Sequence, residues 1–537
     1  MKRRKLLTAS ALMAGVLALT ACVGSDGGST GGGSGEPVID GTLNYAIKDD
    51  PGNLMRHLNT SINVSYVYPW AYESPVYFDE NGQPQGWLAE SWKETPKSLE
   101  FTIREGVMCE DGTELTAETV ANNYRWILDP INGSSFAGLV VPPDAAVEHD
   151  NDTRTVTLTT GTPNSFLLAS IGIHPIYCQG ALDDPDSVAA ATNGTGLYGL
   201  TEAVQGDHYT FERKDDYSWG PKGGVNGSTP GVPKNVVVQV IENPSTRANM
   251  LLSGELNMAQ ISGPDEDRIA AQLEPLISDN LITGGFTFSQ AEGQPTADED
   301  MRVALVKALD LDSLMRVMTS DKGERAPRMA VLAPQMCVYN AAGENLPTTD
   351  VTDAAAMLDE LGWTEGPDGV REKDGEPLEL TFVYNTRYPE IPSVVELMAE
   401  QWEAVGVRTV LEGSSYAAYA ERIVQKNASQ GFDVLWQSAN YSVPNVLAAF
   451  IAGPTPPTGN NYSAIVNPEF DALVAESAKF TGTEACGAWE QAEAELYASA
   501  DYVPFAMHPE VTYAQGVEAA FGNNRWVLGP SFTLVQD

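Results

Sequence analysis

The stretch "FTIREGVMCEDGTELTAETVANNYRWI" (residues 101–127) decides how the N-terminal half of this chain is expected to fold. Asp111 and Gly112 are a turn signal. Thr116 is placed to cap a helix that runs through Val120 into "ANNYRWIL", and Glu118 puts an acid in the first turn, where the helix dipole favours it. The stretch therefore predicts a turn followed closely by a capped helix.

A second stretch, "ATNGTGLYGL" (residues 191–200), raises the question of a nucleotide site. Its Gly-x-Gly-x-x-Gly spacing is that of a dinucleotide fingerprint, which needs a strand before it and a helix after it. Here the order is reversed, because a short helix is expected from about Asp186 and strand-like alternation follows in residues 208–220. We predict a helix, a glycine turn and a hairpin, with Gly194 and Gly196 at backbone torsions barred to other residues, and no nucleotide.

Length, composition and charge limit the class of protein. The chain has 537 residues, of which 42% are hydrophobic, so we expect two or more lobes with substantial cores. Its net charge of −42 repels nucleic acid and anionic lipid. We interpret this charge as the solvated acidic surface of an exported protein, since no local cluster of carboxylates indicates a cation site.

The N-terminus is typical of an exported lipoprotein. Residues 1–21 have a basic start and a short apolar run, which predicts an export signal rather than a membrane span. The Leu-Thr-Ala-Cys sequence that ends at Cys22 resembles the bacterial lipobox, in which the cysteine is lipidated. An ordinary cleaved signal with an incidental cysteine is the alternative. Residues 22–37 are rich in Gly and Ser, so we expect a flexible tether.

Patterns of catalytic or metal-binding residues are missing from the sequence. The histidines stand apart from one another and the cysteines form no CxxC pair, so no zinc site is predicted; the histidines are His57, His149, His174, His208 and His508. No HExxH, GxSxG or Walker sequence indicates hydrolysis or phosphoryl transfer. We therefore expect neither an enzyme nor a cofactor. Without Cys22 an even set of cysteines remains, for which three disulfide pairings are open: Cys109, Cys178, Cys337 and Cys486.

Several of these stretches together resemble one protein family. "NGTGLYGL" followed by "YTFERKDDYSWG" is similar to the glycine turn and hairpin of the extracellular solute-binding proteins of family 5. Residues 72–92 resemble the family's Leu-Ala-Glu-Ser-Trp segment, and residues 101–127 resemble its Asp-Gly-x-x-Leu-Thr-Ala-x-Asp-Val signature, with Thr119 in place of the usual Asp. Further helical or helix-to-strand segments resemble the family at residues 243–257, 298–318, 354–363, 399–411 and 467–478.

The resemblance implies an α/β fold of the two-lobed periplasmic-binding-protein type (cluster C), with mixed sheets and two hinge crossings. On this basis we expect lobe I at residues 38–286, lobe II at 287–504 and a return to lobe I at 505–537. Residues 284–293 and 501–510 are the hinge candidates. The function implied is that of a lipid-anchored, monomeric receptor outside the cell membrane, which captures a peptide or similar small solute and delivers it to an ABC permease.

The resemblance also indicates where a ligand would bind. In peptide-binding relatives an Asp-Tyr-x-x-Pro segment presents an aspartate to the ammonium of the peptide, a charge-assisted contact. The matching residues here are Asn440 and Tyr441, and an amide cannot neutralise a buried ammonium, so the solute is expected to lack a free α-amine there unless Asp433 substitutes.

Aromatic residues suggest other ligands. Trp436, Tyr45, Tyr198 and Trp219 are candidates to stack on an aromatic solute or a sugar. An oligosaccharide receptor on the same scaffold is therefore the alternative function, and an exported hydrolase or adhesin is a further one.

The two-lobed architecture favours one disulfide pairing. A bridge between lobes would oppose the opening and closing that capture requires. We therefore predict Cys109 with Cys178 in lobe I, and Cys337, which follows the long helix of residues 298–318, with Cys486 in lobe II.

Overall fold

The computed structural model describes residues 35–537 except 80, 334, 522–526 and 537. Residues 35–537 form one compact unit. The expected export signal (1–21), the lipidation site Cys22 and nearly all of the expected tether (22–37) lie outside the described residues. In the part of the chain that is described, every helix is too short or too polar to cross a bilayer.

A ten-stranded mixed sheet runs through this unit in the order β17-β16-β18-β12-β19-β11-β1-β10-β9-β8. The strands from the earlier part of the chain form one half of this sheet. At its centre β1 (Thr42–Ile47) pairs in parallel with both β10 (Asn235–Val240) and β11 (Met258–Ile261). The antiparallel strands β9 (His208–Arg213) and β8 (Tyr198–Val204) continue it as the predicted hairpin.

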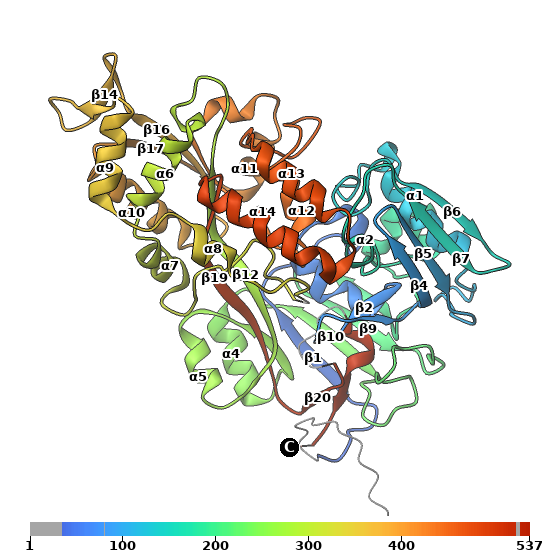
Figure 1. The fold of residues 1–537 in the computed structure, drawn as a ribbon. Coiled ribbons are helices and arrows are strands. Elements are labelled where there is room, and N and C mark those ends of the chain that lie inside the picture. The colour runs from blue at the N-terminus through green and yellow to red at the C-terminus, as the bar shows by residue number, and fades with distance from the viewer. Residues whose placement is uncertain (1–34, 80, 334, 522–526, 537) are drawn as a thin grey trace, which may run out of the picture. The chain divides into compact units, whose positions relative to one another are not determined.

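Two long antiparallel strands, β12 (Pro275–Phe288) and β19 (Tyr502–Ala514), join this half to a second set of strands. Figure 1 shows both running from the region of β1 toward the region of β16 and β17. Beyond them β12 pairs with β18 (Val434–Trp436), which pairs with the parallel strands β16 (Glu379–Asn385) and β17 (Arg408–Ser414). The hinge candidate 284–293 therefore overlaps the end of β12 and continues beyond it, and the candidate 501–510 overlaps the first part of β19.

The predicted turn and capped helix are confirmed. Gly112 has a φ of +82°, and α1 (Ala117–Leu128) begins after Thr116, whose Oγ1 accepts a hydrogen bond of 3.2 Å from the Thr119 N–H. This helix packs against a separate four-stranded sheet in the order β4 (Ala89–Thr95), β5 (Ser98–Ile103), β7 (Thr155–Thr159) and β6 (Ala146–Asp150). In β5 and β7, buried apolar residues alternate with more exposed polar residues, so one face of this sheet belongs to the core.

The explanation predicted for the glycine turn is wrong. Neither Gly194 nor Gly196 has a positive φ. A β-carbon at Gly194 would instead lie 2.2 Å from the carbonyl oxygen of Ala71, and one at Gly196 would lie 2.6 Å from the Ala71 carbonyl carbon. The glycines are needed because another backbone segment passes this close. The expected helix before the turn is a 3-10 helix (Pro185–Ala189) that follows α3 (Gln179–Asp183).

The single long helix expected over residues 298–318 is also a correction. The structure has α6 (Glu299–Lys307) and α7 (Leu311–Thr319), because Asp310 caps a new helix by accepting hydrogen bonds from the backbone N–H groups of Asp312 and Ser313. The other predicted helices form, namely α4 (Pro244–Ser253), α9 (Val351–Glu360), α10 (Ile391–Glu403) and α13 (Pro468–Ser477).

Further helices and small sheets complete the described fold. The remaining α-helices are α2 (Leu167–Ile171), α5 (Glu266–Ala270), α8 (Ala341–Asn345), α11 (Tyr416–Ile423), α12 (Pro444–Ala448) and α14 (Cys486–Ala498). Three small sheets are formed by β2 (Val76–Phe78) with β3 (Pro84–Gly86), by β13 (Thr364–Glu365), β14 (Arg371–Lys373) and β15 (Glu376–Pro377), and by β20 (Val517–Ala519) with β21 (Phe532–Leu534).

The two disulfides have the predicted pairing. Cys109 is joined to Cys178 across 69 residues, and Cys337 is joined to Cys486 across 149 residues. The first ties the turn before α1 to the start of α3, and the second ties the segment before α8 to the start of α14. Neither bridge crosses β12 or β19 in sequence, since the first joins residues that precede β12 and the second joins residues between β12 and β19.

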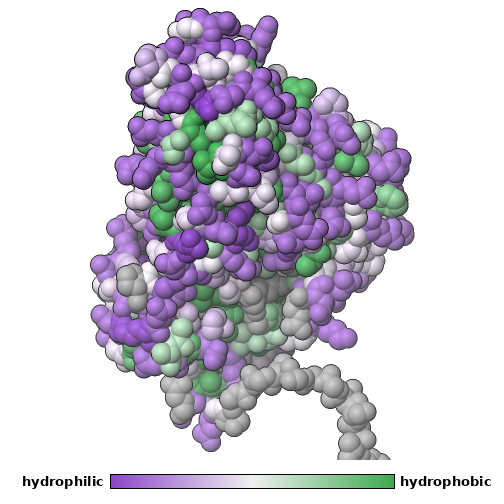
Figure 2. Space-filling view, turned by 60° about the vertical axis from the view of Figure 1, so that its left-hand side comes forward, coloured by the Kyte–Doolittle hydropathy of each residue, from purple (hydrophilic) through white to green (hydrophobic). Residues whose placement is uncertain are grey.

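Hydrophilic residues cover much of one face of the protein (Figure 2). Figure 2 shows a face on which hydrophilic residues predominate and hydrophobic residues form small separate groups. Such a surface suits a chain with a net charge of −42.

Candidate functional site

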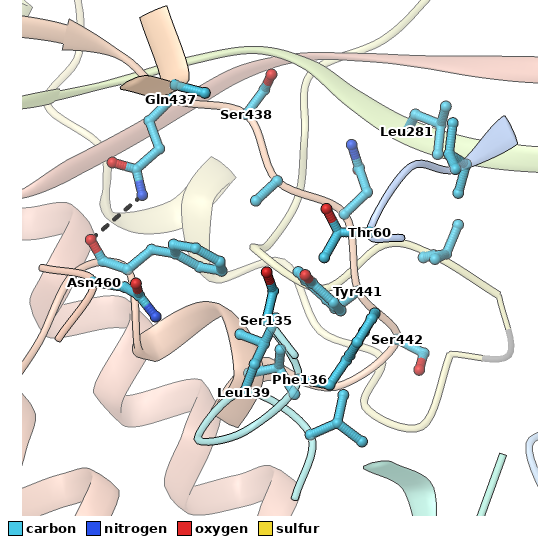
Figure 3. A pocket seen from close by; sticks show the side chains of 18 of the residues that line it. Thr60, Ser135, Phe136, Leu139, Leu281, Gln437, Ser438, Tyr441, Ser442 and Asn460 are labelled. Carbon is cyan, nitrogen blue, oxygen red and sulfur yellow. Dashed lines mark hydrogen bonds between the residues drawn. The ribbon is translucent and has the colours of Figure 1, made fainter. Parts of the chain in front are cut away.

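A cavity of about 590 Å³ is lined by segments that are far apart in the chain. One wall comes from the earlier part of the chain, in residues 56–68, 135–140 and 169–175. The other comes from residues 385–388, 416–424, 436–450 and 460–462. Leu281 of β12 and Leu332 also line the cavity. Figure 3 shows Ser135, Phe136 and Leu139 of the first wall bordering the same space as Tyr441 and Ser442 of the second.

The loop of residues 437–443, which follows β18, is held against β12 by polar contacts. The Gln437 N–H donates to the Gly285 carbonyl oxygen at 2.8 Å and continues the strand pairing. Further along the loop, the side-chain amide of Asn440 makes the two hydrogen bonds to Ile282 that a neighbouring strand backbone would make. Its Oδ1 accepts from the Ile282 N–H at 2.7 Å, and its Nδ2 donates to the Ile282 carbonyl oxygen at 3.1 Å. Asn440 thus lines the cavity as expected, but its amide is already engaged.

Aromatic side chains cover much of the cavity wall. Tyr441 stacks on Phe450 with ring centroids 6.3 Å apart, and Phe450 lies 5.8 Å from Tyr462. The full aromatic lining is Tyr68, Phe136, Tyr388, Tyr416, Tyr419, Trp436, Tyr441, Phe450 and Tyr462. Such surfaces suit an apolar or aromatic solute, or the face of a sugar ring.

Arginines are the charged residues of this lining, and none of the described residues that line it is Asp or Glu. Arg56 donates through Nη1 to the carbonyl oxygens of Asn59 at 2.6 Å and Ser61 at 3.1 Å, and its guanidinium lies 4.9 Å from the ring centroid of Phe136. Arg387 lies over the rings of Tyr388 and Tyr416 at 5.5 and 5.4 Å. The site is therefore cationic within an acidic protein.

A buried histidine pair lies at the first wall and adds no charge. Burial lowers the pKa of His57 to about 3 and that of His174 well below its usual value. Asn123 Oδ1 already accepts from the Tyr177 N–H, so the His57 Nε2–H donates to it at 3.0 Å. His57 Nδ1 is then the acceptor for the His174 Nε2–H, also at 3.0 Å. Of the two, His174 reaches the cavity.

Three expected ligand residues lie elsewhere. Tyr198 is fully buried, packs on Trp70 and donates to the Pro233 carbonyl oxygen at 3.1 Å. Trp219 donates from Nε1 to Glu73 at 3.2 Å, and Tyr45 is buried in β1. The structure places these large rings in the core, outside the cavity lining, because their apolar area is buried there.

The two other candidates differ in position. Trp436 reaches the cavity but has 0% exposure, with its ring edge-on to Phe505. Asp433 is not among the residues that line the cavity. Its carboxylate accepts a hydrogen bond of 2.8 Å from the Thr381 N–H, and burial raises its pKa to about 6. Asp433 is therefore not placed to meet an ammonium group in the cavity.

Arg387 and Tyr416 were not identified from the sequence. Arg387 lies two residues after the carboxyl end of β16, and Tyr416 lies two residues after the carboxyl end of the parallel strand β17. Ligands of open α/β sheets bind outside the carboxyl ends of such strands, so this position was the available signal. Metal ligands are a separate question: in the described part of the chain no group of three His, Cys, Asp or Glu side chains is arranged to hold a metal ion.

Comparison with known proteins gives the same architecture. The oligopeptide-binding protein OppA of Bacillus subtilis is 25% identical over 86% of this chain and 86% of its own length. A substrate binding protein from Microbacterium hydrocarbonoxydans in complex with 4-hydroxybenzoate hydrazide has a similar structure, with a TM-score of 0.69 and 23% identity over 92% of this chain and 100% of that one. The oligopeptide-binding protein AppA of Bacillus subtilis, in complex with a nonapeptide, has a TM-score of 0.71 and 19% identity over 93% of this chain and 100% of that one.

The two-lobed α/β fold expected from the sequence is thus confirmed. The profile of the family described as bacterial extracellular solute-binding proteins, family 5 Middle, matches residues 83–457. Proteins of this family bind solutes and are not enzymes. This chain belongs to the family 5 bacterial extracellular solute-binding proteins.

Proposed function

We propose that this protein is the solute receptor of an ABC importer and that it holds its solute in the cavity beside the 437–443 loop. The observation that carries this proposal is the cavity of about 590 Å³, whose two walls come from different parts of the chain. A solute in such a site contacts both walls, so its binding favours their closed arrangement.

The lobe boundaries belong to the same proposal. Lobe I is residues 38–286 with 505–537, and lobe II is residues 287–504. The walls of the cavity fit this division, since residues 56–175 fall in lobe I and residues 385–462 in lobe II. The hinge is proposed at residues 284–293 and 501–510, beside the irregular register of β12 between Ile282 and Gly285. An irregular ladder has fewer constraints on bending than a regular one.

The solute is proposed to be a peptide or a similar small molecule without a free α-amine at Asn440. Relatives support a peptide, since OppA is an oligopeptide-binding protein and AppA was solved with a nonapeptide. The aromatic lining also suits an oligosaccharide, which is the second candidate. Calorimetry with di- to pentapeptides tests whether a peptide binds and whether its free α-amine is needed. Binding that disappears when the peptide is N-acetylated would contradict our assignment of Asn440.

The protein is further proposed to act as a monomer tethered outside the cell membrane by a lipid on Cys22 and to deliver its solute to a membrane permease. The sequence that ends at Cys22 and the Gly- and Ser-rich residues behind it support this. Cys22→Ser should release the protein from the membrane fraction. Equal retention of variant and parent would contradict the anchor.

Incubation with a mixture of peptides and oligosaccharides tests the receptor function itself. A receptor gains thermal stability from its ligand by mass action and returns it intact. An increase in melting temperature with an unchanged ligand is the expected result. Conversion of the ligand would indicate an exported hydrolase instead, and no stabilisation by any component would favour an adhesin.

A further inference from the structure

We infer that the solute carries a carboxylate or another oxyanion, which Arg387 binds at the second wall of the cavity, together with an aromatic or apolar body. This inference rests on the proposed receptor function and adds the chemical class of the solute.

Charge within the cavity is the first observation. Arg56 and Arg387 line it, and no Asp or Glu among the described residues does so. The chain as a whole has 73 acidic and 31 basic residues, so a lining without acids is the opposite of its average composition. A solute with a positive charge would meet cations here, whereas an anion would be attracted.

Acids whose charge reaches the lining residue Tyr388, namely Glu510 and Asp49, have other partners. Glu510 accepts a hydrogen bond of 2.8 Å from the Tyr66 hydroxyl, and Asp49 lies 3.8 Å from Lys48. Asp433 accepts from the Thr381 N–H. None of these three carboxylates lines the cavity, so none is placed to neutralise the arginines from within it.

Arg387 is the group that can receive an anion. Its guanidinium pairs with no carboxylate of the described residues and lies 5.5 Å from the ring centroid of Tyr388 and 5.4 Å from that of Tyr416. Arginines nearby behave differently: Arg422 of α11 is 2.6 Å from Glu412, and Arg408 of β17 is 2.9 Å from Asp368. Arg387 is solvent-exposed and Tyr416 is 53% exposed, so the guanidinium beside these rings keeps its N–H donors accessible to a ligand.

Arg56 adds positive charge on the opposite wall. Its Nη1 is engaged by two backbone carbonyl oxygens, so it acts here through its charge and not as the main donor to the ligand. The histidine beside it, His174, stays neutral because burial lowers its pKa. Arg56 and Arg387 are thus the charged side chains among the described residues that line the cavity, and Lys48 lies 5.6 Å from the Tyr388 ring centroid, just outside that lining.

The geometry selects both ends of the solute. A carboxylate matches the forked donors of a guanidinium. The stacked rings of Tyr441 and Phe450 can cover an apolar or aromatic body. N-acylated peptides with a free C-terminal carboxylate and small aromatic acids share this chemistry.

Matched ligand pools test the inference. One pool holds N-acetyl dipeptides of Phe, Tyr and Leu with free carboxylates, and a second holds benzoic and phenylacetic acids with ring substituents. Each is compared with the same compounds as primary amides, by thermal shift and then by calorimetry of each hit. We expect a carboxylate to bind about 10- to 100-fold more tightly than its amide, as for a charge-assisted hydrogen bond. The pool that contains the tighter binder identifies the source of the anion.

Two variants assign the effect to one residue. Arg387→Gln should remove most of the preference for the carboxylate, while Arg422→Gln, whose arginine lies outside the cavity lining and is paired with Glu412, should keep it. The inference is overturned if the amides bind as tightly as the acids, if a free amine is required, or if Arg387→Gln binds the acid as the parent does. Binding of a neutral solute alone would keep the receptor function and refute the anion. No binding from any pool would refute the anion, while the receptor function is decided separately by the mixture of peptides and oligosaccharides.

Discussion

Glu73 and Arg387 show how differently this protein surrounds a charge in two regions. Glu73 is 1% exposed, and its carboxylate accepts hydrogen bonds from the Tyr217 hydroxyl, Trp87 Nε1 at 3.1 Å, Thr195 Oγ1 at 2.8 Å and Trp219 Nε1 at 3.2 Å. Arg387 has two aromatic rings beside it and no carboxylate from the described chain. An ionisable group that serves the fold is satisfied by the chain itself, whereas the proposed function leaves the N–H donors of the exposed Arg387 for the solute.

Removal of the Glu73 carboxylate should have the largest effect on stability. Glu73→Leu removes the acceptor of three buried donors, namely the Trp87 indole, the Tyr217 hydroxyl and the Thr195 hydroxyl, while the Trp219 indole keeps the Thr195 carbonyl oxygen. We expect the free energy of unfolding to fall by about 3–5 kcal/mol, measured by denaturant titration. The control is Glu365→Leu at an exposed position of β13, for which little change is expected. If both variants lose the same stability, Glu73 does not organise this region.

The pH dependence of stability tests the same carboxylate. Burial raises the pKa of Glu73 from 4.5 to about 7, so between these values the folded protein keeps a proton that the unfolded chain has lost. Its contribution to the free energy of unfolding is complete below pH 4.5 and is lost as the pH rises to about 7, with a slope of up to about 1.4 kcal/mol per pH unit. Glu73→Gln should flatten the profile across this window. An unchanged profile would show that Glu73 does not titrate there.

Asn440 tests whether a polar group in the cavity can also be satisfied by the chain. Asn440→Asp loses the donor to the Ile282 carbonyl oxygen and sets a carboxylate against it. We expect a loss of about 1–2 kcal/mol in the free energy of unfolding. Asn460→Asp is the matched control, because Asn460 also lines the cavity but its Oδ1 has only a contact of 3.5 Å with the Tyr462 hydroxyl. Equal effects of the two substitutions would contradict the role given to the Ile282 contacts.

The smallest effect on stability is expected at Arg387. Because its guanidinium makes no hydrogen bond or ion pair with described residues, Arg387→Gln should change the free energy of unfolding by less than about 0.5 kcal/mol. Arg371→Gln should cost more, since Arg371 is buried and bonded to Asp359 and to the Val405 carbonyl oxygen. A large loss at Arg387 in thermal unfolding would place this arginine among the structural charges.

Local features of the fold could be predicted from the sequence. The cap at Thr116 and the turn at Gly112 depend on neighbouring residues only, so their pattern was sufficient. The disulfide pairing followed from the lobes that the family resemblance implied. Gly194 was explained incorrectly because its constraint is the Ala71 backbone, more than a hundred residues earlier in the chain.

The site was predicted less well, because burial and contact depend on the whole fold. Trp219 and Tyr198 are aromatic candidates by type, but the core takes them up. Asn440 was placed in the cavity by resemblance, while its bonds to Ile282 depend on where β12 passes. Arg387 and Arg56 meet at one cavity from positions more than three hundred residues apart, which no local pattern indicates.

The most direct test of the central claim is to ask whether solutes enter this cavity. In the variant Ser438→Trp an indole takes the place of a small side chain that lines the cavity (Figure 3). The parent protein and this variant are each incubated with the carboxylate pools, separated from free ligand and analysed by native mass spectrometry. We predict that the parent carries one intact carboxylate solute and that Ser438→Trp carries none. Capture of the same solute by both proteins, or by neither, would contradict the account.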